Sequence, residues 1–215
     1  MSSEINFLIL TKSARFHGNC VVGIDLDSKK LIRLVSNDEK IKNSISNETM
    51  ICENGEIANP TDIVRIKIIK PVPAKYQPEN VLLDCNYKWQ KIRKANFNDV
   101  KPYISNDDYI FCNCREFLTE SNIDTSEKSI IIVKVNDINI YVKEQKYDSG
   151  EIKEKTKIDF KYNSKQYRNF SITDRDYFLR ECNLNEALLV VSIPSEPNNE
   201  FYHKFVAKVF LTKKN

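Results

Sequence analysis

The sequence predicts an all-β protein, mainly strands with a few short helices, arranged as a pair of barrels. Two segments alternate apolar and polar residues, DIVRIKIIK at 62–70 and KIDFKYN at 157–163, and this period of two is typical of half-buried strands. Further short apolar runs recur in both halves of the chain between turn-like polar residues, which is the spacing of a β-barrel. A chain of 215 residues can form one large domain or two small ones.

The first half is predicted to contain four strands. Apolar runs at 5–11 and 19–25 are joined by a basic turn, and LIRLVS at 31–36 forms the third strand. A long polar insertion at 37–60 precedes the alternating strand at 62–70. Together these strands are expected to form a curled antiparallel sheet.

Two different local structures are predicted after this sheet. Prolines bracket the segment PVPAKYQPEN at 71–80, which favours an ordered extended loop over a helix. The side-chain amides of Gln77 and Asn80 are expected to form hydrogen bonds within this loop. The segment KWQKIRKANF at 88–97 is predicted to form a short helix with its tryptophan and isoleucine turned inward and its lysines outward.

The second half returns to strands, which are predicted at 129–135, 138–144, 157–163, 166–173, 187–193 and 201–212. Asn136-Asp137 is a hairpin signal between the first two of them. Thr173 and Asp176 have the spacing of a capping box. They predict a helix of two to three turns that places Phe178 over Cys182.

Composition excludes several classes of protein. A hydrophobic fraction of 41% with 29% charged residues is typical of globular domains and unlike disordered or fibrous chains. No apolar run approaches the roughly 20 residues that span a bilayer, and the first residues, MSSEINFLIL, lack the pattern of a signal peptide. We therefore expect a cytoplasmic protein without a membrane partner. The net charge of +3 permits a polyanionic partner without requiring one.

The sequence supports neither an enzyme nor a cofactor site. Four glycines cannot build a nucleotide-binding glycine loop, and the two histidines, His17 and His203, offer little for nucleophilic catalysis. Cys112 and Cys114 are separated by one residue instead of the two of common zinc sites, and no second pair matches them. We expect no metal, and six free cysteines in a reducing compartment.

Basic residues interleaved with aromatic ones are the main functional signal. Cations neutralise phosphates and aromatic rings stack on unpaired bases, and lysines and arginines surround Tyr76 and Trp89. The same pattern also fits a solvated lysine-rich face, and Trp89 also fits a core position. Arg33 shares a strand face with Leu31 and Val35, where it either pairs with an acid inside the protein or projects into a binding groove.

Several segments resemble one known family. They are LTKSARFHGNCVVGIDLDSKKLIRLVS at 10–36, DIVRIKI at 62–68, PVPAKYQPEN at 71–80, FKYNSKQYRNFSITD at 160–174 and LVVSIPSEPNNEFYHKFVAKVF at 189–210. In this order they are similar to the dual OB-containing domain family, a group linked to bacterial conflict and defence loci. The segment SIPSEPNNE departs from the family pattern, which has a glycine-containing turn there.

The resemblance implies two OB-like β-barrels in tandem, residues 1–125 with long insertions and residues 126–215. It implies a non-enzymatic module that binds nucleic acid, single-stranded or duplex, in a bacterial anti-phage defence system. Two alternatives remain open. One is a protein-interaction subunit that docks an effector protein of the same system. The other is a sensor of a small nucleotide in a pocket formed by Arg33, Gln77 and Asn80.

The residue pattern and the resemblance together define the candidate site. The positions that match the family's polar signature are Lys12, Ser13, Arg33, Gln77, Glu79, Asn80, Tyr167, Thr173, Asp174 and Lys204. The predicted nucleic-acid-binding residues are Lys12, Arg15, Arg33, Arg65, Lys67, Lys75, Gln77, Asn80, Trp89, Arg93, Tyr167 and Lys204.

Overall fold

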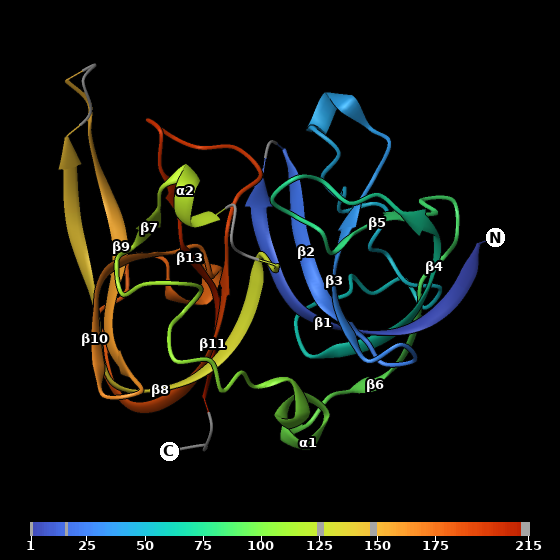
Figure 1. Ribbon diagram of the computed structural model, residues 1–215. Helices are drawn as coiled ribbons and strands as arrows, with labels where there is room; N and C mark the ends of the chain where they lie inside the picture. Colours follow the sequence, from blue (N-terminus) through green and yellow to red (C-terminus); the bar gives the residue numbers. More distant parts are fainter. Residues whose placement is uncertain (1, 16, 124–126, 147–149, 212–215) are drawn as a thin grey trace. The chain divides into compact units, whose positions relative to one another are not determined.

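A computed structural model describes residues 2–15, 17–123, 127–146 and 150–211 of the protein, with the side chain of Arg15 outside the described part. The described elements are mainly strands (Figure 1), which confirms the predicted all-β class. The chain divides into two compact units, Met1–Pro102 and Tyr103–Asn215. No helix in the described segments is both long and apolar enough to cross a membrane.

The first unit is a β-barrel with short helical turns. Its elements are β1 (Ser3–Arg15), β2 (Gly18–Asp25), β3 (Lys30–Val35), the 3-10 turn η1 (Glu39–Ile41), β4 (Asp62–Pro71), β5 (Asn80–Leu83), β6 (Gln90–Lys94) and α1 (Phe97–Val100). The strands follow the order β1-β2-β3-β5-β4-β6, and an additional pairing of β1 with β4 closes the ring. Strand β3 runs parallel to β5, whereas the other neighbours are antiparallel.

Alternation in β4 places its side chains as the sequence predicts. Val64 and Ile66 are fully buried in the barrel core and Ile68 packs against it, whereas Arg65 on the opposite face is exposed. A glycine is required at the β1–β2 contact, because a Cβ atom at Gly23 would lie 2.1 Å from the backbone oxygen of Leu8. The long strands can therefore curve closely enough to form a barrel.

The helix predicted at 88–97 is wrong. Residues Gln90–Lys94 form strand β6, which pairs antiparallel with the start of β4, and Ile92 is 47% exposed instead of turned inward. Pairing with β4 supplies backbone hydrogen bonds from a distant part of the chain, and this tertiary contact overrides the local helical pattern. The inward position of Trp89 and the outward positions of Lys88 and Lys94 are confirmed.

The prediction for the loop at 71–80 is confirmed. Ala74 and Gln77 exchange backbone hydrogen bonds of 3.1 Å, and the Asn80 Nδ2 amide donates to the Gln77 Oε1 oxygen at 3.4 Å. The side chains of Gln77 and Asn80 are buried. The two amides thus hold the proline-bracketed loop against the barrel, as expected for polar groups that satisfy a turn locally.

The second unit is a closed barrel with a small two-stranded ribbon. Its elements are β7 (Phe117–Leu118), α2 (Glu120–Ile123), β8 (Ile130–Lys146), β9 (Ile152–Tyr162), β10 (Lys165–Ile172), the 3-10 turn η3 (Arg175–Tyr177), β11 (Cys182–Ser192), β12 (Tyr202–His203) and β13 (Phe205–Leu211). A further 3-10 turn, η2 (Lys101–Tyr103), lies at the boundary of the two units. The barrel order is β10-β13-β11-β8-β9, and β12 pairs with β7.

The two barrels share one topology. In each, the third and last strands of the ring run parallel to one another, β3 with β5 and β10 with β13. The core of the second barrel includes Phe160, Tyr162, Tyr167 and Phe170. Phe160 and Tyr162 therefore point inward, as their alternation with Lys157 and Lys161 predicts.

The segment before β8 also belongs to the second barrel. Ile110 is fully buried in its core, and the Ile110 backbone N–H donates to the Tyr167 hydroxyl at 3.2 Å. The Tyr162 hydroxyl donates to the backbone oxygen of Asp107 at 2.5 Å. The expected division between residues 125 and 126 assigns this segment to the first barrel, but these contacts attach it to the second.

Two further local predictions are wrong. Asn136 and Asp137 form a bulge inside β8 instead of a hairpin turn, with Asp137 at a φ of 50°. The strand continues because β9 and β11 pair with it on both sides of the bulge. The predicted helix after residue 173 is the short turn η3, capped by Asp174, and Phe178 is 69% exposed.

Candidate functional site

Most of the predicted basic residues lie in the first unit, where acids compensate several of them. Arg93 forms a bidentate salt bridge with Asp99, with Nη–Oδ distances of 2.8 and 2.6 Å. Its hydrogen bonds lower the pKa of the Asp99 carboxyl to about 2. Lys67 lies 3.4 Å from Asp84. Charge that the sequence assigns to a binding face is thus partly neutralised within the barrel.

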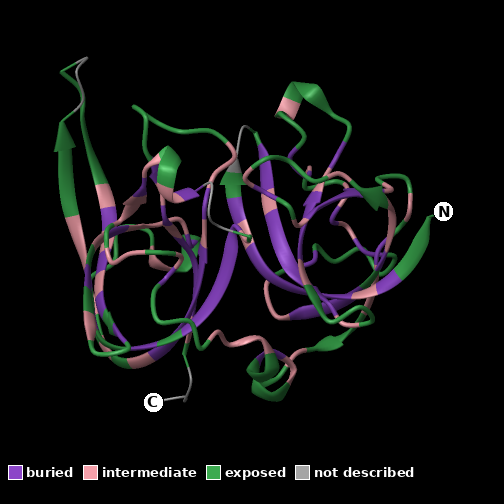
Figure 2. Ribbon diagram, in the orientation of Figure 1, coloured by how far each residue is buried: buried purple, intermediate pink, exposed green. Residues whose placement is uncertain are grey.

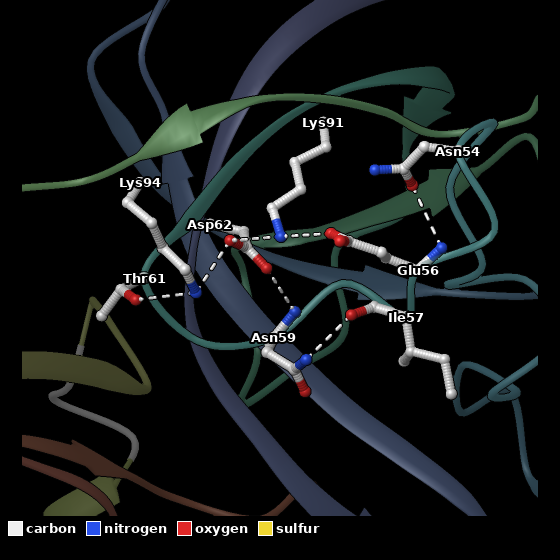
Figure 3. Close-up of polar contacts among 8 residues, drawn as sticks. All are labelled: Asn54, Glu56, Ile57, Asn59, Thr61, Asp62, Lys91 and Lys94. Atoms are coloured by element: carbon white, nitrogen blue, oxygen red, sulfur yellow. Dashed lines mark hydrogen bonds and ion pairs between the residues drawn. The ribbon is translucent and has the colours of Figure 1, made fainter.

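A buried carboxylate neutralises two of the lysines near Trp89, Lys91 and Lys94 (Figure 3). Asp62 is fully buried, and its carboxylate forms ion pairs with the Lys94 ammonium at 2.9 Å and the Lys91 ammonium at 3.5 Å. The Lys91 ammonium also pairs with the Glu56 carboxylate at 2.7 Å. This network connects β6 to the start of β4 and to the loop before it. We assign it a structural role because Asp62 has no exposed surface.

Arg33, Gln77 and Asn80 do come together, as the small-nucleotide alternative requires. Arg33 pairs with Asn80 across the parallel strands β3 and β5, and the Arg33 Nη1 group lies 3.0 Å from the Cys20 Sγ atom. Their side chains are almost completely buried, however. These buried side chains therefore belong to the packing of the barrel and of the loop before β5.

Two aromatic predictions need correction. Trp89 is fully buried in the first core, and Tyr167 is fully buried in the second, stacked on Phe160 with ring centroids 5.2 Å apart. Neither ring has an open face for a nucleic-acid base. Both rings lie in the barrel cores because burial of large apolar rings stabilises the fold.

The remaining predicted cations of the first unit are dispersed. Arg65 is exposed on β4, Lys12 is half-buried on β1, and the Lys75 ammonium lies 4.5 Å above the Tyr76 ring in the loop before β5. Arg15 ends β1, and its side chain lies outside the described residues. The described side chains of this set lie on three different elements, two strands and a loop.

Lys204 is buried in the second unit and acts as an internal anchor. Its ammonium donates to the backbone oxygens of Ile110 at 2.9 Å and Asn113 at 2.8 Å, and to the Asn113 Oδ1 oxygen at 2.9 Å. These bonds fasten the segment before β7 onto the barrel. Burial lowers the pKa of the Lys204 ammonium to about 8, because desolvation disfavours the charged form.

This lowered pKa predicts a pH dependence of stability. Between pH 8 and the ordinary value of 10.5, the unfolded chain binds more protons than the folded protein. The free energy of unfolding therefore rises with pH in this window, by up to about 3 kcal/mol. Urea denaturation of the protein and of Lys204→Met across this window measures the effect. The variant should lack the extra rise, and equal pH slopes for the two proteins would contradict the assignment.

A pocket of about 280 Å³ lies on the outer face of the second barrel. Its lining residues come from β8, β9, β10, β12 and the segment before β7; they are Glu116, Lys143, Glu144, Gln145, Lys157, Asn169, Ser171, His203 and Lys204. The lining combines cations, acids and amides. It therefore offers donors for an anionic group and acceptors for amino or hydroxyl groups of the same ligand.

Lys157 is the central cation of this pocket. Its ammonium donates to the Ser171 hydroxyl at 2.8 Å and to the Asn169 backbone oxygen at 3.4 Å. Burial lowers the pKa of the Lys157 ammonium, while Glu116 acts in the opposite direction. A half-buried ammonium held in a fixed direction is well suited to receive a phosphate oxygen.

Aromatic side chains continue the pocket along the β7–β12 ribbon. The Phe117 ring lies 4.5 Å from the Phe201 ring and 6.3 Å from His203, and the Arg115 guanidinium lies 5.9 Å from Phe117. Phe201 is 36% exposed. Burial lowers the pKa of the His203 imidazole, so this ring is neutral near pH 7. Cations and accessible rings therefore lie side by side.

Apart from Lys204, this site was missed by the sequence analysis. Its one available signal was the row of alternating lysines, Lys153, Lys155 and Lys157, which leads into the strand predicted at 157–163. The pairing of β12 with β7, which brings His203 to Phe117, has no short-range signature. In the described part of the chain, no three His, Cys, Asp or Glu side chains are placed to hold a metal ion.

Comparison with known proteins adds one family. The model of the dual OB-containing domain matches residues 5–209, nearly the whole chain. Searches of curated proteins and of solved structures gave no match. The matched range includes both barrels and every residue of the pocket.

Proposed function

Because this chain belongs to the dual OB-containing domain family, we propose that it is a binding module whose ligand is single-stranded nucleic acid. OB barrels bind oligonucleotides across their second and third strands and the adjoining loops. In the second barrel these strands are β9 and β10, and the adjoining loops are those before β9 and between β11 and β13. The pocket lies on β9 and β10, and His203 reaches it from the second of these loops.

The observation that carries this proposal is the contact of a lysine pocket with accessible aromatic rings. The Lys157 ammonium and the neighbouring Lys143 suit a phosphate, and Phe117 and Phe201 offer ring faces to a base. Small-molecule pockets usually measure roughly 300–1,000 Å³, so about 280 Å³ suits a single nucleotide unit. An unpaired strand can place one such unit in the pocket, whereas a duplex keeps its bases stacked inside.

The test is fluorescence anisotropy with labelled single-stranded DNA and RNA at several salt concentrations. Lys157→Met should weaken binding by about tenfold or more, because a charge-assisted hydrogen bond contributes about 1.5–3 kcal/mol. The log–log salt slope should become shallower by roughly 0.7. Lys161→Met is the matched control, because Lys161 lies on the same strand but pairs with Asp137 at 2.8 Å. Equal losses in the two variants, or salt-independent binding, would contradict the proposal.

The ring contribution is tested separately with Phe201→Ala. Base stacking on an aromatic side chain contributes about 1–3 kcal/mol, and Phe201 is accessible enough for its removal to spare the fold. If a mononucleotide competes with the single-stranded oligonucleotide at similar affinity, the result would instead favour a small-nucleotide sensor that uses this pocket rather than Arg33, Gln77 and Asn80.

The alternative of an effector-docking subunit has one observation in its favour. Phe178 and the adjacent Leu179 are 69% and 41% exposed after the turn η3, and exposed apolar side chains suit protein contacts. Phe178→Ser would reduce such docking and leave nucleic-acid binding unchanged. A role in bacterial anti-phage defence stays a prediction that rests on the family resemblance.

A further inference from the structure

The β8–β9 hairpin extends beyond the second barrel as an exposed arm, defined as residues 143–146 of β8 and 152–155 of β9. In Figure 1 these strands rise past the rest of their unit, and Figure 2 colours the arm mainly as exposed. The arm is antiparallel and regular, with Lys143 opposite Lys155, Glu144 opposite Glu154 and Lys146 opposite Ile152. Its base adjoins the pocket, because Lys143 and Gln145 belong to the arm and also line the pocket.

The two faces of the arm differ in charge. Successive side chains of a strand point to opposite faces, so the pairs Lys143–Lys155 and Gln145–Lys153 share one face with Lys157 at the base. We call this the lysine face. Lys153 also lies 3.1 Å from Glu151. The opposite face carries the pairs Glu144–Glu154 and Lys146–Ile152 and continues the barrel interior.

Like charges stand directly opposite one another on the lysine face. Identical charges at paired positions of antiparallel strands destabilise the pairing, and Lys143 is paired with Lys155. Burial lowers the pKa of the Lys157 ammonium, and charge repulsion from Lys143 and Lys155 lowers it further. The three ammonium groups are therefore close enough to interact electrostatically. A bound polyanion relieves this repulsion, because each phosphate can be shared by neighbouring lysines.

We propose that the lysine face carries the sugar–phosphate backbone of the strand whose nucleotide occupies the pocket. This inference rests on the proposed function and extends its ligand from one nucleotide to a run of several. Residues two apart in a strand lie roughly 7 Å apart, which is comparable to the spacing of successive phosphates in an unstacked strand. Lys157, Lys155 and Lys153 follow this spacing along β9, from the pocket to the outer part of the arm.

The experiment measures affinity for a short oligonucleotide of about 4 nucleotides and for a longer one of about 12, within the range of OB site sizes. The protein should bind the longer oligonucleotide more tightly. Lys143→Gln should weaken binding of the longer one by about two- to fivefold, as expected for an exposed charge contact. Lys143→Gln/Lys155→Gln should remove most of the length dependence. The log–log salt slope of this double variant should become shallower by roughly 0.7 for each lost phosphate contact.

Lys146→Gln is the matched control. It removes the same charge from the same arm but on the opposite face, so it should leave the length dependence intact. Equal losses in Lys143→Gln and Lys146→Gln, or equal affinity of the unmodified protein for both lengths, would overturn the arm inference. Lys157→Met would still test the pocket in that case. No binding of either oligonucleotide would overturn both proposals.

Discussion

Replacing Trp89 with alanine is expected to lower the free energy of unfolding by about 3–5 kcal/mol, the usual cost of removing a buried tryptophan. Trp89 is fully buried in the first core, beside core residues such as Met50 and Cys52. Its loss leaves a cavity that the surrounding strands fill only partly. Affinity for nucleic acid, expressed per folded molecule, should stay unchanged. Denaturant titration and anisotropy on the same variant measure both quantities.

Trp89→Phe is the control for this experiment. The indole Nε1 group has no hydrogen-bond partner among the described residues, so phenylalanine removes an unsatisfied donor while it keeps most of the apolar ring. We expect a much smaller loss of stability than with alanine. A Trp89→Ala protein with full stability and weakened binding would show that this side chain is part of an interface after all.

Replacing Asp174 with alanine is expected to cost about 3 kcal/mol, the low end for breaking a buried ion pair, because Lys208 keeps the exposed Asp176 carboxylate as a second partner. Asp174 receives the Lys208 ammonium at 3.0 Å, the Asp176 backbone N–H at 3.1 Å and the Val209 backbone N–H at 3.0 Å. Both Asp174 and Lys208 are buried. The carboxylate thereby ties the turn η3 to β13.

The double variant Asp174→Ala/Lys208→Met separates charge burial from packing. If the cost arises mainly from a buried ammonium that keeps only the exposed Asp176 carboxylate as partner, the double variant should be more stable than Asp174→Ala alone. Urea denaturation monitored by circular dichroism measures the three proteins. Additive losses would show that Asp174 acts chiefly through its two backbone hydrogen bonds.

The parts of the fold that sequence predicted are those with local periodicity. Strand β4 could be predicted because Val64 and Ile66 alternate with Arg65 and Lys67, and one face of the strand is buried. Strand β6 could not, because its conformation depends on pairing with a strand about 30 residues earlier. The bulge at Asp137 was missed for the same reason, since local chemistry favours a turn and two flanking strands override it.

The candidate site was less predictable than the fold. Charge counts found basic residues in the first unit, but they could not reveal that Asp62 and Asp99 neutralise them. The pocket collects side chains from β8, β9, β10 and β12, and only the folded topology brings these strands together. Lys157 illustrates the difficulty, since the sequence correctly gives it an outward direction but gives no sign of what it meets there.

The strand order of the two barrels has a consequence during protein synthesis. The last strand needed to close the first ring is β5, which ends at Leu83, whereas the second ring requires β13, which ends at Leu211. At roughly 5–20 residues per second, on the order of ten seconds separates the synthesis of the two strands. The first barrel can fold on the ribosome during this interval, while β8 and β11 still lack β13. Late in this interval, once β8 and β11 have been synthesised, the nascent chain exposes the edge strand of an open second sheet. Such an edge is prone to aggregation until β13 covers it.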